Sequence, residues 1–517
     1  MSDVMMDHHP TRGIREKIAQ FSSEYSPYTT EKQIFQRGLS AILLDLPCTD
    51  NGNAIRFSSR FGHLIRYVAE QKAFFTWEGE RWEEDKKEKV VALARETANF
   101  ISIEMSLLVL PKGADEDEIR AYKKRLSEIF RWSLKSQDKH SIDAMVELVK
   151  SESGITVLQS ELDQDDYLLN LKNGTFDLRA GKLKPHDPHD LITKLAPVVY
   201  DPETQCPNWN KFMFKVVRGN RALFDFLQDL VGCGLTGKQL DDILPISFGP
   251  GGNGKGIFAE TLKNVLGDYA STATSDLFLA RNNEGVSNDR ACLVGVRFLT
   301  ASETDEGRRL NEALVKSMTG GDTQKVRFLH KEFFELVPKF TAMLFTNHKP
   351  IIGGTDQGIW RRVKLIPWLH DFTKDPEIEP RPVVMARMEA ESSGILNWAI
   401  AGYVRRMQTS QIQVPREVAA ETDIYRRQSD TLAEFLEDCC VVDEQDAEVT
   451  KKDLYEKYCK FAEEAGQKNV STAKSFGMRL MERTDIAYLG ERKVKSARYW
   501  TGIRLRTDHD NEQTEVF

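Results

Sequence analysis

The sequence has no excess of positive charge, no long apolar run and no regular cysteine spacing. Its 517 residues carry 71 Lys or Arg against 79 Asp or Glu, a formal net charge of −8. A chain that coats nucleic acid along its whole length is usually basic, so any nucleic-acid contact here must use local positive charge. The length predicts roughly three domains of about 150 residues each.

Two further absences exclude other classes of protein. The seven cysteines include no C-x-x-C spacing, which favours reduced, packed thiols over a zinc site or a disulfide framework. No apolar run reaches the roughly 18 residues that a membrane helix needs, and the first 20 residues lack the apolar segment of a secretory signal. We therefore expect a cytoplasmic protein, in a bacterial cell or an infected host cell, with no membrane partner.

Hydrophobic patterning divides the chain into six segments. Apolar strands at 243–248, 296–301 and 341–346 alternate with helices, which predicts an α/β fold with a parallel sheet. The expected segments are a mostly helical region at 1–150, a strand-rich connector at 151–205, the α/β core at 206–370, a helical lid with a proline-containing linker at 371–430, a small basic domain at 431–508 and an acidic tail at 509–517. Within them we expect helices at about 116–150 and 209–237, a hairpin turn at Asn173-Gly174 and the linker itself at 371–382.

A glycine-rich loop is the most informative motif. It matches G-x-x-x-x-G-K between a predicted strand and a predicted helix. Glycines let backbone N–H groups turn inward around phosphate oxygens, and the helix N-terminus adds partial positive charge. The lysine would supply a point charge to the β- and γ-phosphates of ATP, whereas the alternative is a simple glycine-rich turn. The loop consists of Gly249, Pro250, Gly251, Gly252, Asn253, Gly254, Lys255 and Gly256.

Gly256 departs from the usual pattern, because a Ser or Thr is expected after the lysine. That hydroxyl normally ligates Mg²⁺. Without it, Mg²⁺ would depend on waters, nucleotide oxygens and downstream carboxylates, or hydrolysis would be weakened.

Two polar side chains follow the next predicted strands. Glu303 stands after the strand at 296–301, where a carboxylate can orient the attacking water or support Mg²⁺, with Asp305 as a second candidate ligand. Asn347 follows the strand at 341–346, where it can contact the γ-phosphate or position water. The alternative interpretations are a surface acid and a turn residue before a proline.

Basic side chains occur at two further positions in the core. A predicted β-hairpin carries Lys325, Arg327, His330 and Lys331, which could grip a phosphate backbone. Arg361 and Arg362 follow an apolar anchor, and one of them could stabilise transition-state charge in a neighbouring subunit. The sequence leaves open which of the two does so, and solvated charged surfaces remain the alternative at both positions.

The order of these motifs resembles the superfamily 3 helicases of the phage and plasmid primase–helicase type. The resemblance covers roughly residues 50–505. It rests on Gly-Pro-Gly-Gly-Asn-Gly-Lys at 249–255, Ser-Glu-Thr at 302–304, Thr-Gly-Gly-Asp at 319–322, Phe-Thr-Asn-His-Lys-Pro at 345–350 and Trp-Arg-Arg at 360–362.

The resemblance implies an AAA+-like P-loop ATPase core and a ring hexamer that hydrolyses ATP with Mg²⁺ at subunit interfaces. It also implies 3′-to-5′ movement on single-stranded DNA during replication of a phage, plasmid or other mobile element, together with other replication proteins. The N-terminal portion is shorter than the catalytic primase domain of many relatives, so we expect no primer synthesis.

The C-terminal segment is the local basic region that the overall composition requires. Residues 449–506 contain 14 Lys or Arg against 7 Asp or Glu. Two predicted helices and a strand–turn–strand favour a winged helix that binds duplex DNA, with a protein-interaction wing as the alternative. The basic wing residues are Arg492, Lys493, Lys495 and Arg498.

Two other functions are compatible with a phosphate loop. A small-molecule kinase would explain the loop but neither the hairpin nor the basic C-terminal domain. An origin-binding initiator, switched by ATP and hydrolysing it weakly because of Gly256, would explain all three. Strand separation distinguishes the motor from the switch.

Overall fold

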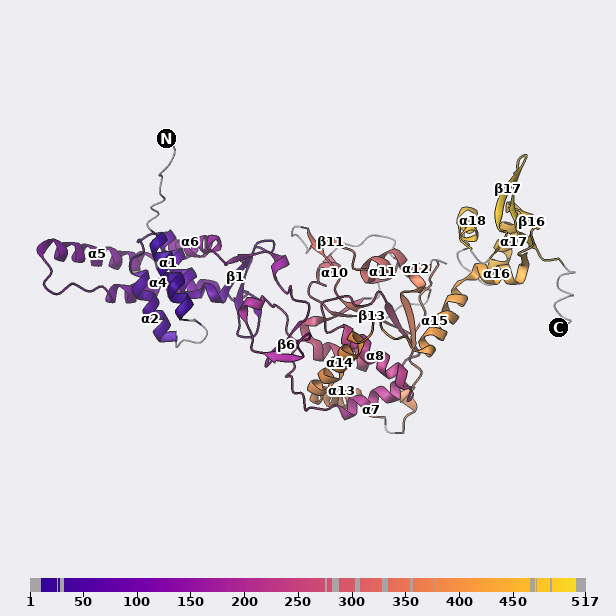
Figure 1. The fold of residues 1–517 in the computed structure, drawn as a ribbon, viewed down its shortest axis with the longest axis horizontal. Helices are drawn as coiled ribbons and strands as arrows, with labels where there is room; N and C mark the ends of the chain where they lie inside the picture. Colours follow the sequence, from indigo (N-terminus) through magenta and orange to yellow (C-terminus); the bar gives the residue numbers. More distant parts are fainter. Residues whose placement is uncertain are drawn as a thin grey trace. The chain divides into compact units, whose positions relative to one another are not determined.

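The computed structural model describes residues 11–25, 27, 32–274, 277–280, 288–302, 307–327, 333–353, 357–376, 378–464, 470, 472–483 and 486–507 (Figure 1). These residues form two compact units that divide after Tyr200. Across the described ranges, no helix is both long enough and apolar enough to cross a membrane.

Six helices dominate the first unit. Thr49 caps one of them by accepting a hydrogen bond from the Gly52 backbone N–H at 3.0 Å, and a reciprocal capping box of Asp115 and Glu118 begins another. The single helix expected over 116–150 is two helices, because the chain turns at Ser136–Asp138. The helices are α1 Arg12–Glu24, α2 Lys32–Leu43, α3 Asp50–Phe61, α4 Lys89–Ser106, α5 Glu116–Lys135 and α6 Lys139–Leu148.

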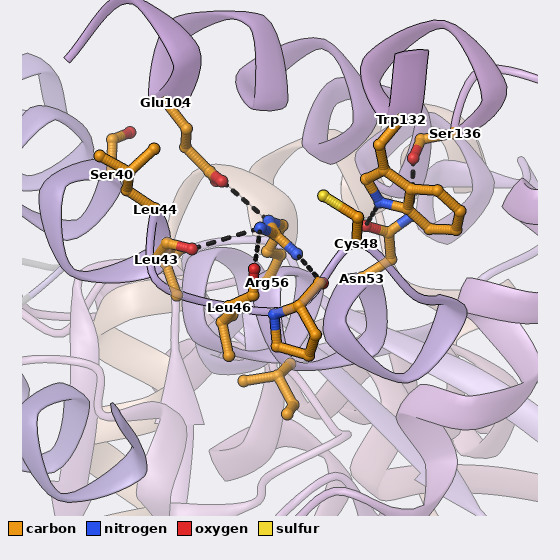
Figure 2. A network of polar contacts seen from close by, with 12 residues as sticks. Ser40, Leu43, Leu44, Leu46, Cys48, Asn53, Arg56, Glu104, Trp132 and Ser136 are labelled. Atoms are coloured by element: carbon orange, nitrogen blue, oxygen red, sulfur yellow. Dashed lines mark hydrogen bonds and ion pairs between the residues drawn. The ribbon is translucent and has the colours of Figure 1, made fainter. Parts of the chain in front are cut away.

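A buried charged network ties α2, α3 and α4 together (Figure 2). Glu104 accepts from Arg56 Nε at 2.8 Å and from Arg60 Nη2 at 2.7 Å, and all three side chains are at most 1% exposed. Arg56 also donates to the carbonyl oxygens of Leu43, the last residue of α2, and of Leu46, which lies just beyond it. The network therefore holds the C-terminal end of α2 against α3 and α4.

Two small sheets complete the first unit. One has the order β3-β2-β1-β4 and the other the order β5-β6-β7. The expected hairpin turn at Asn173-Gly174 is confirmed, since Gly174 has φ +145° and a Cβ there would lie 2.4 Å from the Lys184 carbonyl oxygen. The strands are β1 Ile65–Val68, β2 Ala73–Trp77, β3 Trp82–Glu84, β4 Thr156–Val157, β5 Leu168–Leu171, β6 Gly174–Asp177 and β7 Lys182–Lys184.

A five-stranded parallel sheet forms the centre of the second unit. Its order is β14-β8-β13-β10-β9, and every neighbouring pair is parallel. The predicted α/β sheet is confirmed, with two of the three predicted strands starting one or two residues later than expected. The strands are β8 Leu244–Phe248, β9 Ala270–Thr274, β10 Phe298–Ser302, β13 Thr341–Thr346 and β14 Val363–Pro367, and the antiparallel pair beside them is β11 Gln324–Val326 and β12 Phe334–Leu336.

Helices cover this sheet, and the helix expected over 209–237 is two helices, α7 and α8. In Figure 1, α7, α8, α13 and α14 gather on one side of the sheet. Trp209 of α7 packs against Phe258 and Trp398 there, at ring-centroid distances of 5.7 and 5.4 Å. The helices are α7 Pro207–Val216, α8 Arg221–Cys233, α9 Lys255–Leu266, α10 Asn288–Ala291, α11 Glu312–Thr319, α12 Gln357–Trp360, α13 Arg381–Ala390, α14 Ser392–Met407 and α15 Arg416–Ser429.

The described residues of the segment 371–382, expected to be a linker, are mostly exposed, but Phe372 within it packs against the rest of the second unit. The Phe372 backbone N–H donates to the Gly252 carbonyl oxygen at 3.0 Å, and the Phe372 ring stacks on Phe212 at 5.4 Å. The prolines that suggested a linker instead precede and begin α13.

The C-terminal elements enclose a core of their own, which includes Phe435, Tyr458 and Trp500. Two helices and an antiparallel strand pair lie where the sequence predicted them. The elements are α16 Thr431–Cys439, β15 Cys440–Val442, β16 Glu448–Thr450, α17 Lys451–Glu464, α18 Ala473–Met481, β17 Gly490–Val494, β18 Ala497–Thr501 and β19 Ile503–Leu505.

Candidate functional site

The glycine-rich loop connects the end of β8 to the start of α9. Gly252 and Gly254 have φ of +76° and +88°, a backbone region that favours glycine. A Cβ on Gly249 would lie 2.3 Å from the Trp368 carbonyl oxygen, and buried Asn253 donates to that same oxygen at 3.1 Å. The loop is therefore fixed by its own sequence and by the residue that follows β14.

Lys255, the first residue of α9, points back into the loop. Its Nζ donates to the carbonyl oxygens of Gly249 and Thr346, the second at 3.0 Å, and to Asn347 Oδ1 at 2.8 Å. Burial lowers the pKa of Lys255 to about 8. The ammonium group is held by three oxygen acceptors where a phosphate could replace them.

The sheet order explains why Asn347 reaches Lys255. β13 lies between β8 and β10, so the carboxyl ends of these parallel strands meet at one edge, where α/β sheets bind ligands. Phe345 of β13 is in register with Ser302, the last residue of β10. The predicted carboxylates Glu303 and Asp305 lie outside the described residues.

Position 256 offers no ligand to a metal ion, since it is glycine. A Cβ there would meet only the guanidinium nitrogens of Arg381, at 3.7 and 3.8 Å, so a serine would fit. The residues that the structure describes contain no cluster of three or more His, Cys, Asp or Glu side chains able to hold a metal.

A cavity with a mixed lining adjoins the loop and was missed by the sequence analysis. It measures about 150 Å³, and charged side chains (Lys211, Lys215, Asp375, Glu379 and Arg387) line it together with apolar ones, which include Phe212, Ile257, Phe372, Val384 and Met388. The two aromatic rings also touch the loop, because each would lie 2.9 Å from a Cβ on Gly254. The lining side chains come from four separate segments, so no local pattern in the sequence marks the cavity.

Arg361 and Arg362 differ sharply in their surroundings. The Arg362 side chain is 10% exposed, donates from Nε to Thr319 Oγ1 at 3.1 Å and donates from Nη1 to the Gly358 carbonyl oxygen at 2.9 Å. The Arg361 side chain is 66% exposed, and its Nη2 lies 3.9 Å from the carboxylate of Asp242. Only Arg361 is thus accessible to another molecule without rearrangement of the core.

The predicted hairpin is present as β11 and β12. Lys325 is exposed on β11, and the Arg327 guanidinium lies 4.7 Å from the centre of the Phe333 ring. His330 and Lys331 at the predicted tip lie outside the described residues.

The basic residues of the C-terminal domain lie on β17, β18 and the turn between them. Lys493 and Arg498 stand opposite each other in register, an arrangement of like charges that destabilises a strand pair. Lys495 sits in the turn with φ +51°. Arg492 donates to Glu448 at 3.1 Å, so part of its charge is compensated.

Three protein-family descriptions match segments of this chain. Residues 54–218 match "D5 N terminal like", residues 247–362 match "Family of unknown function (DUF5906)" and residues 427–501 match "Poxvirus D5 protein-like". The matches support a D5-type primase–helicase family.

Viral proteins are among the relatives. "Putative helicase L207/L206" of Acanthamoeba polyphaga mimivirus is 28% identical over 316 residues, 57% of this chain and 33% of the relative. "Putative helicase 184R" of Invertebrate iridescent virus 6 is 23% identical over 65% of this chain and 38% of the relative. "Putative primase C962R" of African swine fever virus (isolate Tick/Malawi/Lil 20-1/1983) is 22% identical over 62% and 34%. The chain thus spans about a third of the length of these relatives.

Among solved structures, the apo C-terminal region of NrS-1 (residues 305–718) is similar over 85% of this chain and 96% of that chain, with a TM-score of 0.47 and 9% identity.

Two of the matched segments contain the candidate sites. The segment 247–362, which matches the family of unknown function, begins in β8 and ends at Arg362, so it holds the loop, Asn347 and both arginines. The segment 427–501 holds the basic residues of β17 and β18.

Proposed function

We propose that this chain is an ATP-dependent DNA helicase of superfamily 3 that unwinds DNA during replication of a viral or other mobile element. In this proposal the second unit is an AAA+-like P-loop core followed by a C-terminal winged helix. The observation that carries the proposal is the contact between Lys255 and Asn347 at the edge where β8 and β13 end. A simple glycine-rich turn would not require the side-chain amide of a residue after a neighbouring strand to contact the lysine of the loop.

ATP is the proposed substrate. Its phosphates would displace the oxygen acceptors from Lys255 and receive hydrogen bonds from the loop N–H groups at the start of α9. The cavity beside Gly254, where Phe212 and Phe372 offer aromatic surface, is the proposed site of the base. Mg²⁺ would accompany the nucleotide, bound by water and phosphate oxygens and, in the proposal, by Glu303 and Asp305.

Hydrolysis needs a water-orienting group and positive charge at the γ-phosphate. We assign the first role to Glu303 and the sensing of the γ-phosphate to Asn347. Arg361 is the proposed finger for a neighbouring subunit, because Arg362 is engaged in its own core. A finger supplied in trans requires a neighbouring subunit, and by family resemblance the proposed assembly is a homohexameric ring.

DNA would bind at two places. The β11–β12 hairpin, with Lys325, Arg327, His330 and Lys331, would contact the single strand and move along it, with 3′-to-5′ polarity by family resemblance. The exposed charges at Lys493, Lys495 and Arg498 would contact phosphates of duplex DNA. The proposal includes other replication proteins as partners, and the absence of primer synthesis remains a prediction.

The test is ATP hydrolysis by the full chain with and without single-stranded DNA, beside Lys255→Ala, followed by strand displacement from a forked duplex. A motor hydrolyses ATP faster with DNA, separates the strands and loses both activities in Lys255→Ala.

One alternative rests on Gly256. If the chain binds duplex DNA in an ATP-dependent way but separates no strands, it is an origin-binding switch with weak hydrolysis. Phosphorylation of a sugar or nucleoside would identify a kinase, and either outcome would contradict the helicase proposal.

A further inference from the structure

Arg381 lies beside the phosphate loop although it is 125 residues beyond Gly256 in the chain. It is the first residue of α13, and its Nη2 and Nη1 atoms would lie 3.7 and 3.8 Å from a Cβ on Gly256. Gly256 is in turn the second residue of α9. The guanidinium group therefore faces the first turn of the helix that follows the loop.

The positive charge of Arg381 is unfavourable beside the first turn of α9 unless a negative group compensates it. The N-terminus of α9 carries the partial positive charge of the helix dipole, and Lys255 adds a full charge. Arg381 is held there by Glu260, one turn further along α9, which accepts from Arg381 Nη2. Burial does not fix the pair, because the two side chains are 61% and 44% exposed.

An exposed ion pair of this kind contributes little to stability. The stability of the ion pair therefore does not explain why Arg381 lies beside Lys255 and the N-terminus of α9, which are also positive. A bound triphosphate would explain this placement, because its negative charge would be attracted to all three groups.

We propose that Arg381 is a phosphate-binding residue of the nucleotide site in its own subunit, an inference that rests on the proposed function. When nucleotide binds, the guanidinium group leaves Glu260 and donates to the β- and γ-phosphate oxygens. It thereby supplies positive charge at the position where other phosphate loops carry a metal-binding hydroxyl.

Helix α13 connects this contact to the rest of the site. Val384 and Met388, on the next turns of the same helix, line the cavity beside the loop. A triphosphate nucleotide with its base in that cavity would be held at both ends by α13. ADP lacks the γ-phosphate and would be held less strongly at the Arg381 end.

Gly256 and Arg381 are coupled in this arrangement. A serine at position 256 would fit, but its Cβ would already lie 3.7 Å from Arg381 Nη2. Glycine leaves the approach of Arg381 to the phosphate unobstructed.

The experiment measures the Kd of a fluorescent ATP analogue for the full chain, with Mg²⁺ and with EDTA. Arg381→Ala should weaken binding by about tenfold or more in EDTA, the range of a hydrogen bond to a charged group. Arg381→Lys should recover part of the loss. Glu260→Gln should leave the affinity unchanged or increase it, because it releases the guanidinium group.

Lys263→Ala is the charge-matched control, since Lys263 is exposed near the other end of α9, and it should change the Kd less than twofold. The unfolding midpoint of each variant shows whether the fold is intact. If Arg381→Ala binds as wild type, or if Arg381→Ala and Glu260→Gln weaken binding alike, the pair is structural and the inference is wrong.

Lys255→Ala separates this inference from the proposed function. If Lys255→Ala loses binding and Arg381→Ala does not, only the role of Arg381 fails. If Lys255→Ala binds normally, the loop is not a nucleotide site and both proposals fail.

Discussion

Lys255 and Asn347 are 92 residues apart in the sequence, yet Lys255 Nζ donates to Asn347 Oδ1 at 2.8 Å. The contact joins the first residue of α9 to the residue after β13, because β13 lies directly beside β8 in the sheet. A phosphate that replaces this amide at Lys255 would come within reach of Asn347 in the same step. The geometry thus links nucleotide binding to a group that can sense the γ-phosphate.

Replacing Asn347 by Ala should separate binding from hydrolysis. We expect the Kd for ATP to change less than about threefold, while kcat falls about 100-fold, the size of effect that follows loss of one positioned polar group. Steady-state ATPase assays and nucleotide titration measure the two quantities. Asn397→Ala is a suitable control, since Asn397 bonds the Asp201 and Thr204 carbonyl oxygens. An equal loss of binding and turnover would argue against a sensor.

The two neighbouring arginines should give opposite phenotypes. Arg362→Ala removes a buried side chain that bonds Thr319 and Gly358, so we expect a loss of about 3 kcal/mol in the free energy of unfolding. Arg361→Ala should leave stability within about 0.5 kcal/mol but abolish hydrolysis. Urea unfolding measures the stability of the two variants, and ATPase assays measure their hydrolysis. Normal hydrolysis by Arg361→Ala would show that Arg361 is not the arginine finger.

Nucleotide affinity should fall as the pH rises above about 8. The lowered pKa means that Lys255 in the empty site loses its proton as the pH passes about 8, whereas a bound triphosphate favours the ammonium form. Binding then takes up a proton, and Kd should rise by up to about tenfold per pH unit. Titrations from pH 7 to 9.5 measure this dependence. In Lys255→Arg, whose side chain stays charged, the slope should disappear.

The stability of the first unit should depend on Glu104, the acid of its buried charged network. Glu104→Gln leaves Arg56 and Arg60 buried without a negative partner, and we expect about 3–5 kcal/mol of destabilisation. Hydrogen exchange of α3 and α4 would localise the effect. Glu147→Gln is the control, because the Glu147–Lys150 pair is largely exposed on the acid side and should contribute about 0–1 kcal/mol. Equal effects would contradict this account.

The strand pair β17–β18 should bind duplex DNA through unpaired charge. Lys493→Ala and Arg498→Ala should each weaken binding and lower the slope of log K against log salt by about 1. Neither should reduce stability, because each removes a repulsion between opposed like charges. Arg492→Ala should have a smaller effect, since Glu448 compensates Arg492. An unchanged salt slope in all three would favour a protein-binding wing.

The sequence by itself determined the local elements and their chemistry. The 249–256 pattern between an apolar strand and an amphipathic helix predicted the loop, since the positive φ of Gly252 and Gly254 is a local requirement that glycine meets. Alternating apolar segments predicted the parallel sheet, and the strand–turn–strand near the C-terminus was equally local. Some helices that we expected as single elements are pairs of helices. In these cases the chain turns without a break in the polar or apolar pattern of the sequence, as at Ser136–Asp138.

Only the tertiary structure decided which distant residues meet. The strand order brings Asn347 to Lys255, packing buries Arg362 and leaves Arg361 accessible, and α13 carries Arg381 to Gly256. The prolines near 380 suggested a linker, but Phe372 packs on the loop and on Phe212. These outcomes depend on contacts between segments more than 40 residues apart, which hydrophobic periodicity cannot encode, because periodicity fixes the face of an element and not its neighbour.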